Sequence, residues 1–179
     1  GQIGSAINEV LDPLEMEVFN TDKEELDITD TDEVLNFGVI NRPDVIINCA
    51  AVTDTDLCEK EPELAYRVNA LGARNLSIVA RKTGAKMVQI STDDVFDGIR
   101  HTPYTEFDDT NPKTVYGRSK RAGENYVKEF THKHFILRSN WVYGNGNNFV
   151  NRVLHAADTK DELLIASDQF GSPTSAKDL

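Results

Sequence analysis

The chain has 179 residues, 39% of them hydrophobic and 8% aromatic, which is enough for one globular domain with a substantial core. Its formal net charge of −11 argues against nucleic-acid binding, which needs clustered Lys and Arg. No apolar run approaches the roughly 20 residues that span a bilayer and no signal peptide is recognisable, so we expect a cytoplasmic protein without a membrane partner.

The predicted elements alternate between strands and helices. The ranges 15–20, 44–50, 86–91 and 134–140 are predicted strands, and 29–40, 63–84 and 118–130 are predicted helices. The run 44–50 is almost continuously apolar, as expected for a strand buried on both faces. A Thr/Asp cap opens the first helix, and Gly84 ends the second. This order predicts an α/β fold with a Rossmann-like, doubly wound parallel sheet.

The first four residues, Gly1-Gln2-Ile3-Gly4, open an amphipathic segment, and Asp22 follows about 20 residues later. This spacing is typical of a dinucleotide-binding fingerprint, in which glycines admit the pyrophosphate and a later acid binds the adenosine ribose. A glycine pair at a helix start is also common without any cofactor. If the fingerprint applies, the first strand is absent from the chain, and we expect a fragment of a longer protein.

Two pairs of reactive side chains have less certain roles. Tyr116 and Lys120 are spaced i and i+4, which puts them on one helix face. Alone, this pair is better explained as an ordinary solvated pair on a helix than as proton chemistry. The only cysteines, Cys49 and Cys58, form neither a zinc site nor a disulfide framework. We interpret Cys49 as a small hydrophobe at a strand end and Cys58 as incidental.

Eight motifs cover nearly the whole chain in a specific order. They are GQIG (1–4), LDITD (26–30), RPDVIINCAAVT (42–53), ELAYRVNALGARNL (63–76), ISTDDVFDG (90–98), NPKTVYGRSKRAGE (111–124), RSNWVYGNGNNFV (138–150) and DQFGSPT (168–174). Together they resemble the extended short-chain dehydrogenase/reductases, and among these the dTDP-4-dehydrorhamnose reductases.

The resemblance implies reduction of the 4-keto group of dTDP-4-dehydro-L-rhamnose to dTDP-L-rhamnose, with NADH or NADPH as the cofactor. It implies an NAD(P)-binding domain at 1–150 that lacks its first strand, and the start of a substrate-binding region at 151–179, most of which is absent. The partner would be a dTDP-sugar. The sequence leaves a homodimer and a Mg²⁺ ion open.

The resemblance also implies roles for individual residues. Tyr116 would donate the proton, Lys120 would lower the tyrosine pKa and hold the nicotinamide ribose, and Thr92 would hydrogen-bond the substrate oxygen. The implied cofactor-binding residues are Gly1, Gln2, Ile3, Gly4, Asp22, Asp27, Ile28, Ala50, Ala51, Asn69, Tyr116 and Lys120. The implied substrate-binding residues are Thr53, Asp94, Phe96, Asn140, Trp141 and Gln169. No metal ligands are implied.

Two questions stay open at this point. The carboxylate of Asp22 would repel a 2′-phosphate and so slightly favours NADH, although the neighbouring Lys23 weakens that inference. Three positions, Val52, Asp94 and Asn140, depart from the usual pattern of the family on the substrate side. These departures leave the sugar undecided, and drift at tolerant positions explains them equally well.

The alternatives to a reductase are a nucleotide-sugar epimerase or dehydratase and a non-catalytic binding subunit. The epimerase or dehydratase would use the same Tyr/Lys pair with a tightly bound NAD. The binding subunit would resemble the reductase-like regulatory subunit of methionine adenosyltransferase. A polypeptide that truly lacked the first strand would be expected to show weak activity or none.

Overall fold

The computed structural model describes residues 1–11 and 16–179, and it confirms the α/β class. The chain forms two compact units. We call residues 20–138 the central unit and residues 1–19 with 139–179 the terminal unit. This geometric division does not follow the boundary at residue 150 given above. The assignment of cofactor and substrate regions therefore stays a prediction.

A three-stranded sheet forms the middle of the central unit. Strand β2 (Lys86–Thr92) lies between β1 (Val45–Asn48) and β3 (His134–Ser139). Strands β1 and β2 are parallel, with Val45 opposite Lys86 and Asn48 opposite Gln89. Because parallel strands end at the same edge of a sheet, the residues that follow β1 and β2 emerge close together.

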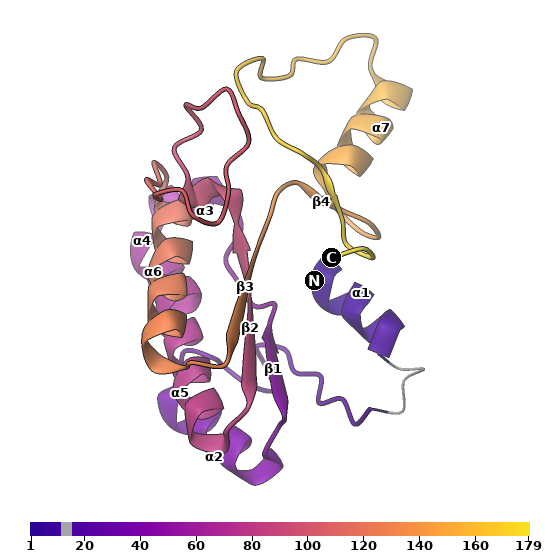
Figure 1. Ribbon diagram of the computed structural model, residues 1–179. Coiled ribbons are helices and arrows are strands. Elements are labelled where there is room, and N and C mark those ends of the chain that lie inside the picture. Colours follow the sequence, from indigo (N-terminus) through magenta and orange to yellow (C-terminus); the bar gives the residue numbers. More distant parts are fainter. Residues whose placement is uncertain (12–15) are drawn as a thin grey trace. The chain divides into compact units, whose positions relative to one another are not determined.

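Three helices cover one face of this sheet: α2 (Thr31–Asn41), α5 (Ala73–Thr83) and α6 (Val115–Phe130) (Figure 1). Their apolar sides and strand β2 build the main core. Its buried members are Leu26, Val34, Ala73, Leu76, Val79, Ala80, Ala85, Met87 and Val127. Apolar residues at helical spacing thus become the buried stripe of each helix, as the sequence pattern predicts.

Helix ends follow the local capping rules. The side chain of Asp30 accepts hydrogen bonds from the backbone N–H groups of Asp32 and Glu33, which confirms the predicted acidic cap of α2. Gly84 ends α5 in the left-handed conformation, at φ 80°. The short helix α3 (Thr55–Lys60), which the sequence reading missed, begins at Asp54, whose side chain accepts from the Leu57 N–H.

The helix predicted over 63–84 is present but is not uniformly α-helical. It consists of α4 (Pro62–Tyr66), a π-helical segment (Arg67–Gly72) and α5. Such wide turns are rare and often mark functional positions. Here the wide turn contains Asn69, which is 2% exposed and whose side chain contacts two other elements.

Two strand predictions need correction. The predicted strand at 15–20 is not observed over Met16–Asn20, which is exposed, and Glu15 lies outside the described residues. The boundary between the two units falls inside this segment, after Phe19. Strand β1 is not buried on both faces, because Val45 and Ile47 are 46% and 37% exposed. Ile46, which points to the other face, packs against the main core.

The cysteines also differ from expectation. Cys58 has no exposed surface and packs in a small second core with Ala65 and Val115, so it is a structural residue. Cys49 directly follows β1 and is exposed, so it does not act as a buried hydrophobe.

The terminal unit contains α1 (Gln2–Leu11), β4 (Val142–Tyr143), α7 (Phe149–Thr159) and β5 (Thr174–Ser175), with β4 and β5 parallel. Asn148 caps α7 by accepting from the Asn151 N–H. The Gln2 side chain donates to the Asn147 carbonyl at 3.0 Å. Among the helices in the described ranges, none has the length and apolar character to cross a bilayer.

Candidate active site

The end of β2 shapes the first part of the site. Thr92 ends the strand in an extended conformation, and its hydroxyl caps a short 3₁₀ turn (Asp93–Val95) by accepting from the Asp94 N–H at 3.2 Å. The same hydroxyl donates to Asp93 Oδ1 at 3.3 Å. The Thr92 side chain is therefore fixed from both sides at the carboxyl edge of the sheet.

The start of α6 supplies the second part. Thr114 caps the helix by accepting from the Gly117 N–H at 2.9 Å, which places Tyr116 in the first turn. Gly117 lies so close to the 3₁₀ turn that a Cβ there would stand 2.2 Å from the Asp94 carbonyl oxygen. This backbone contact brings Tyr116 to Thr92, and their side chains are hydrogen-bonded.

Tyr116 is a neutral phenol at physiological pH. Burial raises its pKa to about 12, and the carboxylates of Asp94 and Asp93 add to the rise, while the hydrogen bond with Thr92 opposes it. The net shift is upward because burial dominates it, and the expectation that Lys120 favours the phenolate stays a prediction. The side chain therefore holds its proton firmly until a stronger base, such as an alkoxide, is next to it.

Lys120 lies four residues further along α6 and is 4% exposed. Its ammonium donates to the Ile90 carbonyl oxygen at 2.7 Å. Burial lowers the pKa of Lys120 to about 8, an effect that the negative charge of Glu124 partly offsets. The ammonium is thus charged at neutral pH and is anchored to the end of β2.

Asn69 connects the wide helical turn to the loop after β1. Its amide oxygen accepts from the Val52 N–H at 2.8 Å, and its amide nitrogen donates to the Val52 carbonyl at 3.0 Å. The same nitrogen donates to Ser119 Oγ at 2.9 Å, and Ser119 in turn donates to the Tyr116 carbonyl at 2.8 Å. This buried network fixes the first turn of α6 relative to the loop.

Asp93 and Asp94 are adjacent, half-buried carboxylates beside Tyr116. Burial and the charge of Asp94 raise the pKa of Asp93 to about 6, and burial raises the pKa of Asp94. Because the pKa of Asp93 is higher in the folded state than its ordinary value of 3.8, ionisation of Asp93 destabilises the fold above about pH 6.

We therefore expect Asp93→Asn to raise the free energy of unfolding at pH 7.5 by about 1–3 kcal/mol. The gain should shrink as the pH falls through 6 and vanish below about pH 4, where the wild-type carboxyl is protonated in both states. Urea unfolding at several pH values measures it, with exposed Asp109→Asn as the control. A gain that is independent of pH would contradict the prediction.

The candidate cofactor residues of the central unit lie after the strands or in the turns near them. Asp22 is exposed and folds its own turn, because Oδ1 accepts from the Glu24 N–H at 2.8 Å. Asp27 Oδ1 accepts from the Thr29 N–H, and this hydrogen bond lowers its pKa. Ile28 packs against Gly72, where a Cβ would stand 2.5 Å from its Cδ1.

Hydrogen bonds of the Asn48 side chain hold the loop after β1. The Ala50 N–H donates to Asn48 Oδ1 at 3.1 Å, and Asn48 Nδ2 donates across the sheet to Gln89 Oε1 at 2.9 Å. Ala50 is exposed and Ala51 half-buried, so two small side chains follow the strand at the sheet edge. Their small size leaves room for a ligand to approach the backbone.

The substrate candidates are divided between the two units. Thr53 is exposed in the central unit. The ring of Phe96 has partners within the protein, because it stacks on Tyr104 with centroids 4.4 Å apart and has the Arg138 guanidinium 4.9 Å from its centre. Phe96 thus anchors the loop that follows the 3₁₀ turn.

The other candidates belong to the terminal unit. Asn140 and Trp141 contact Gly171 closely, since a Cβ at Gly171 would stand 2.1 Å from Asn140 Nδ2. Gln169 is exposed in the same DQFGSPT segment, and the residues 1–4 lie at the start of α1. The structure brings Thr92, Tyr116, Lys120, Asn69 and Asp94 together in the central unit, and these other candidates belong to the terminal unit.

Sequence reasoning missed a buried charged cluster next to Lys120. Glu124 accepts from Ser91 Oγ at 2.7 Å and from Arg138 Nε at 2.8 Å. The spacing of Lys120 and Glu124, four residues apart in the YGRSKRAGE motif, was the available signal. The close approach of Gly117 to the 3₁₀ turn was also missed, although Gly117 lies in the same motif.

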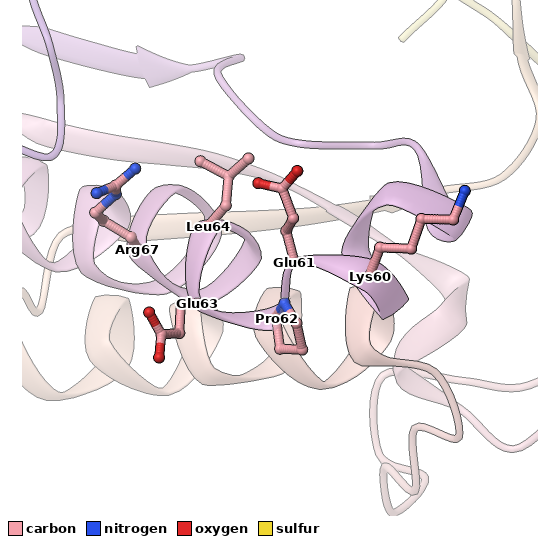
Figure 2. Close-up of a pocket in the computed structure, with 6 residues that line it drawn as sticks. All are labelled: Lys60, Glu61, Pro62, Glu63, Leu64 and Arg67. Carbon is pink, nitrogen blue, oxygen red and sulfur yellow. The ribbon is translucent and has the colours of Figure 1, made fainter.

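A surface hollow lies outside this site. Residues from the end of α3 and from α4 line it, and Figure 2 shows Lys60, Glu61 and Arg67 directed to one side of the chain and Glu63 to the other. Its mixed charges indicate no ligand class. Within residues 1–11 and 16–179, no group of three or more His, Cys, Asp or Glu side chains could hold a metal ion.

Comparison with known families decides the relationship. The chain matches the family described as RmlD substrate binding domain from residue 1 to residue 179. It belongs to that family. One relative of this RmlD-family chain is the spore coat polysaccharide biosynthesis protein SpsK of Bacillus subtilis, which is 43% identical over 180 residues. The alignment covers 100% of this chain and 64% of SpsK.

Two crystal structures resemble the RmlD-family chain closely. A dTDP-4-dehydrorhamnose reductase from Clostridium acetobutylicum has 47% sequence identity and a TM-score of 0.97. A dTDP-4-dehydrorhamnose reductase from Bacillus anthracis, solved in complex with NADP, has 45% identity and a TM-score of 0.95. Each match covers 99% of this chain and 64% of the other. The RmlD-family chain therefore spans less than two thirds of these relatives.

Proposed function

We propose that this chain is the catalytic part of an NAD(P)H-dependent reductase that converts dTDP-4-dehydro-L-rhamnose into dTDP-L-rhamnose. The observation that carries the proposal is the hydrogen-bonded pair Thr92–Tyr116 beside the buried ammonium of Lys120. The names of the two similar crystal structures, both dTDP-4-dehydrorhamnose reductases, support the reaction. The NADP in one of them supports the cofactor class.

The residues of the central unit fit a dinucleotide. Ala50 and Ala51 leave the backbone accessible at the sheet edge, and Asp22 offers a carboxylate acceptor at an exposed turn. The Lys120 ammonium has three N–H donors and hydrogen-bonds the Ile90 carbonyl within the described part of the chain, which leaves donors for a ribose hydroxyl. We propose that Lys120 and Tyr116 hold the nicotinamide half and that Asp22 accepts from the adenosine ribose. Asp27 and Ile28 would lie near the adenine.

The chemistry follows from what the side chains can do. When bound, the reduced nicotinamide supplies a hydride to the ketone carbon of the sugar. Negative charge then grows on the ketone oxygen, and hydrogen bonds from Thr92 and Tyr116 stabilise it. Tyr116 gives its proton to that oxygen, because an alkoxide is a stronger base than a phenolate. The Lys120 ammonium stabilises the phenolate that remains.

The substrate side of the proposal rests on fewer contacts. Asp94 lies beside Tyr116 and would face the sugar. Thr53, Asn140, Trp141 and Gln169 stay predicted substrate-binding residues. An epimerase or dehydratase reading, and a non-catalytic binding subunit, stay as alternatives. A homodimer and a cytoplasmic location also stay predictions.

The test is an assay of the full-length protein with dTDP-4-dehydrorhamnose, in which loss of reduced-nicotinamide absorbance is followed with NADH and separately with NADPH. Turnover of the keto sugar with one or both cofactors is the expected result. Cofactor binding without turnover would favour a different sugar or a binding subunit. A protein purified with tightly bound NAD that acts without added reductant would favour the epimerase reading.

A further inference from the structure

Glu124 has no exposed surface, and it has no part in the chemistry proposed above. Its carboxylate accepts from Ser91 Oγ at 2.7 Å, from Arg138 at 2.8 and 2.7 Å, and from Arg121 at 2.9 Å. Burial alone would raise the pKa of Glu124, but the hydrogen bonds and charge of Arg138, with the Ser91 bond, outweigh burial and lower it. The side chain is thus a buried, ionised carboxylate.

The contacts of α6 with the end of β2 show where this carboxylate acts. Lys120 donates to the Ile90 carbonyl, Glu124 accepts from Ser91, and Tyr116 is hydrogen-bonded to Thr92. Three helix residues spaced four apart therefore hold three consecutive strand residues. Side chains spaced i and i+4 are neighbours on a helix surface, so Glu124 is next to Lys120 on the face that carries Tyr116.

We propose that Glu124 is a positioning residue, whose carboxylate keeps the buried Lys120 ammonium charged and whose bond to Ser91 holds Lys120 and Tyr116 in register with Thr92. The inference rests on the proposed function, since it concerns the same Tyr/Lys pair. It adds that the buried Lys120 ammonium depends on the negative charge of Glu124.

The charges around Lys120 explain why one anion matters. Burial lowers the pKa of Lys120, and Glu124 on the same helix raises it, as does Cys49 from the segment after β1. Arg138 on β3 and Arg121 on α6 are both paired with Glu124. Removal of the Glu124 charge would leave these two cations uncompensated beside Lys120. The remaining phenol on this face, Tyr116, is neutral and offers no compensating charge.

The test is Glu124→Gln in the full-length protein, with two readouts. The first is the pH profile of kcat/KM, in which we expect the basic limb to move to lower pH by about 1 unit, the smallest shift that a close opposite charge usually causes. The second is a pH titration of the ¹³Cε resonance of Lys120 in the Tyr116→Phe background, assigned with Lys120→Arg. This titration needs no turnover, so it tests the role of Glu124 even if the proposed reaction is wrong.

Arg138→Met is the matched control, because it damages the same buried network while keeping the carboxylate. A purely structural role for Glu124 predicts similar titrations in both variants. The charge role predicts a lower pKa of Lys120 in Glu124→Gln and an unchanged or higher one in Arg138→Met. Glu124→Asp, which keeps the charge, should restore most of the wild-type pKa.

If Glu124→Gln does not fold, the double variant Glu124→Gln/Arg138→Met, which removes an anion and a cation together, is compared with Arg138→Met alone. A lower pKa of Lys120 in the double variant supports the proposal. A pKa of Lys120 that does not fall when Glu124 loses its charge, in either comparison, overturns it.

Discussion

Replacing Tyr116 with phenylalanine should lower kcat of the full-length protein by about 10²–10⁴-fold, which is the usual contribution of a positioned general acid. The substitution removes one oxygen from a partly buried side chain and keeps the ring. Thr92 loses a hydrogen-bond partner, but its bonds to Asp93 and to the Asp94 N–H remain. We therefore expect KM for the keto sugar and the dissociation constant of the cofactor to change much less than kcat.

The matched control is Tyr126→Phe, which makes the same chemical change in the same helix. Tyr126 packs at a tilt against Phe130, with ring centroids 6.2 Å apart, and lies ten residues from the candidate proton donor. This variant should retain wild-type kcat. Equal losses in the two variants, or an active Tyr116→Phe, would show that Tyr116 is not the proton donor.

Gly117→Ala should damage both stability and catalysis. The new Cβ would stand 2.2 Å from the Asp94 carbonyl oxygen, and backbone on both sides must move to admit it. Overpacking of this kind costs about 1–3 kcal/mol. A displacement of about 1 Å between catalytic groups can cost about 10²-fold in rate. We expect a loss of 1–3 kcal/mol by urea unfolding and a drop in kcat of about 10²-fold, since Tyr116 moves relative to Thr92.

The neighbouring substitution Arg118→Ala tests the specificity of this effect. Arg118 is exposed and donates to the Lys113 carbonyl at 2.8 Å, so its replacement leaves the contact between α6 and the 3₁₀ turn intact. It should have nearly wild-type stability and kcat. If Gly117→Ala were as stable and as active as Arg118→Ala, the close backbone approach would not be what positions Tyr116.

The helices and most strands could be predicted because their signals are local. Apolar spacing, the Asp30 cap and the Gly84 stop lie within each element. The strand predicted at 15–20 is not observed over 16–20, because a short alternating pattern fixes neither a strand nor its burial. The exposure of Val45 and Ile47 was missed for a related reason, since an apolar run does not say how many faces of a sheet are covered.

The candidate site was only partly readable from the sequence. The motif around Tyr116 and Lys120 placed the two side chains on one helix face, and the fold brought Thr92 to them. The raised pKa of Tyr116 was not foreseen, because burial and two nearby carboxylates are properties of the folded chain. The role of Glu124 was hidden for the same reason: its four hydrogen bonds come from residues as far away in the chain as Ser91 and Arg138.

The π-helical segment at Arg67–Gly72 makes the angular phase of the long helix depend on an exact residue count. An α-helix turns by about 100° per residue, whereas a π-helical turn takes up one extra residue within a single turn. If this segment became regularly α-helical with all its residues kept, everything after it would therefore rotate by about that angle. Ala65 on one side and Ala73 on the other are both fully buried, in two different cores. A helix that was regular through 67–72 with the same residues could bury only one of these alanines in its core, so the wide turn is what allows one continuous helix to contribute to both cores.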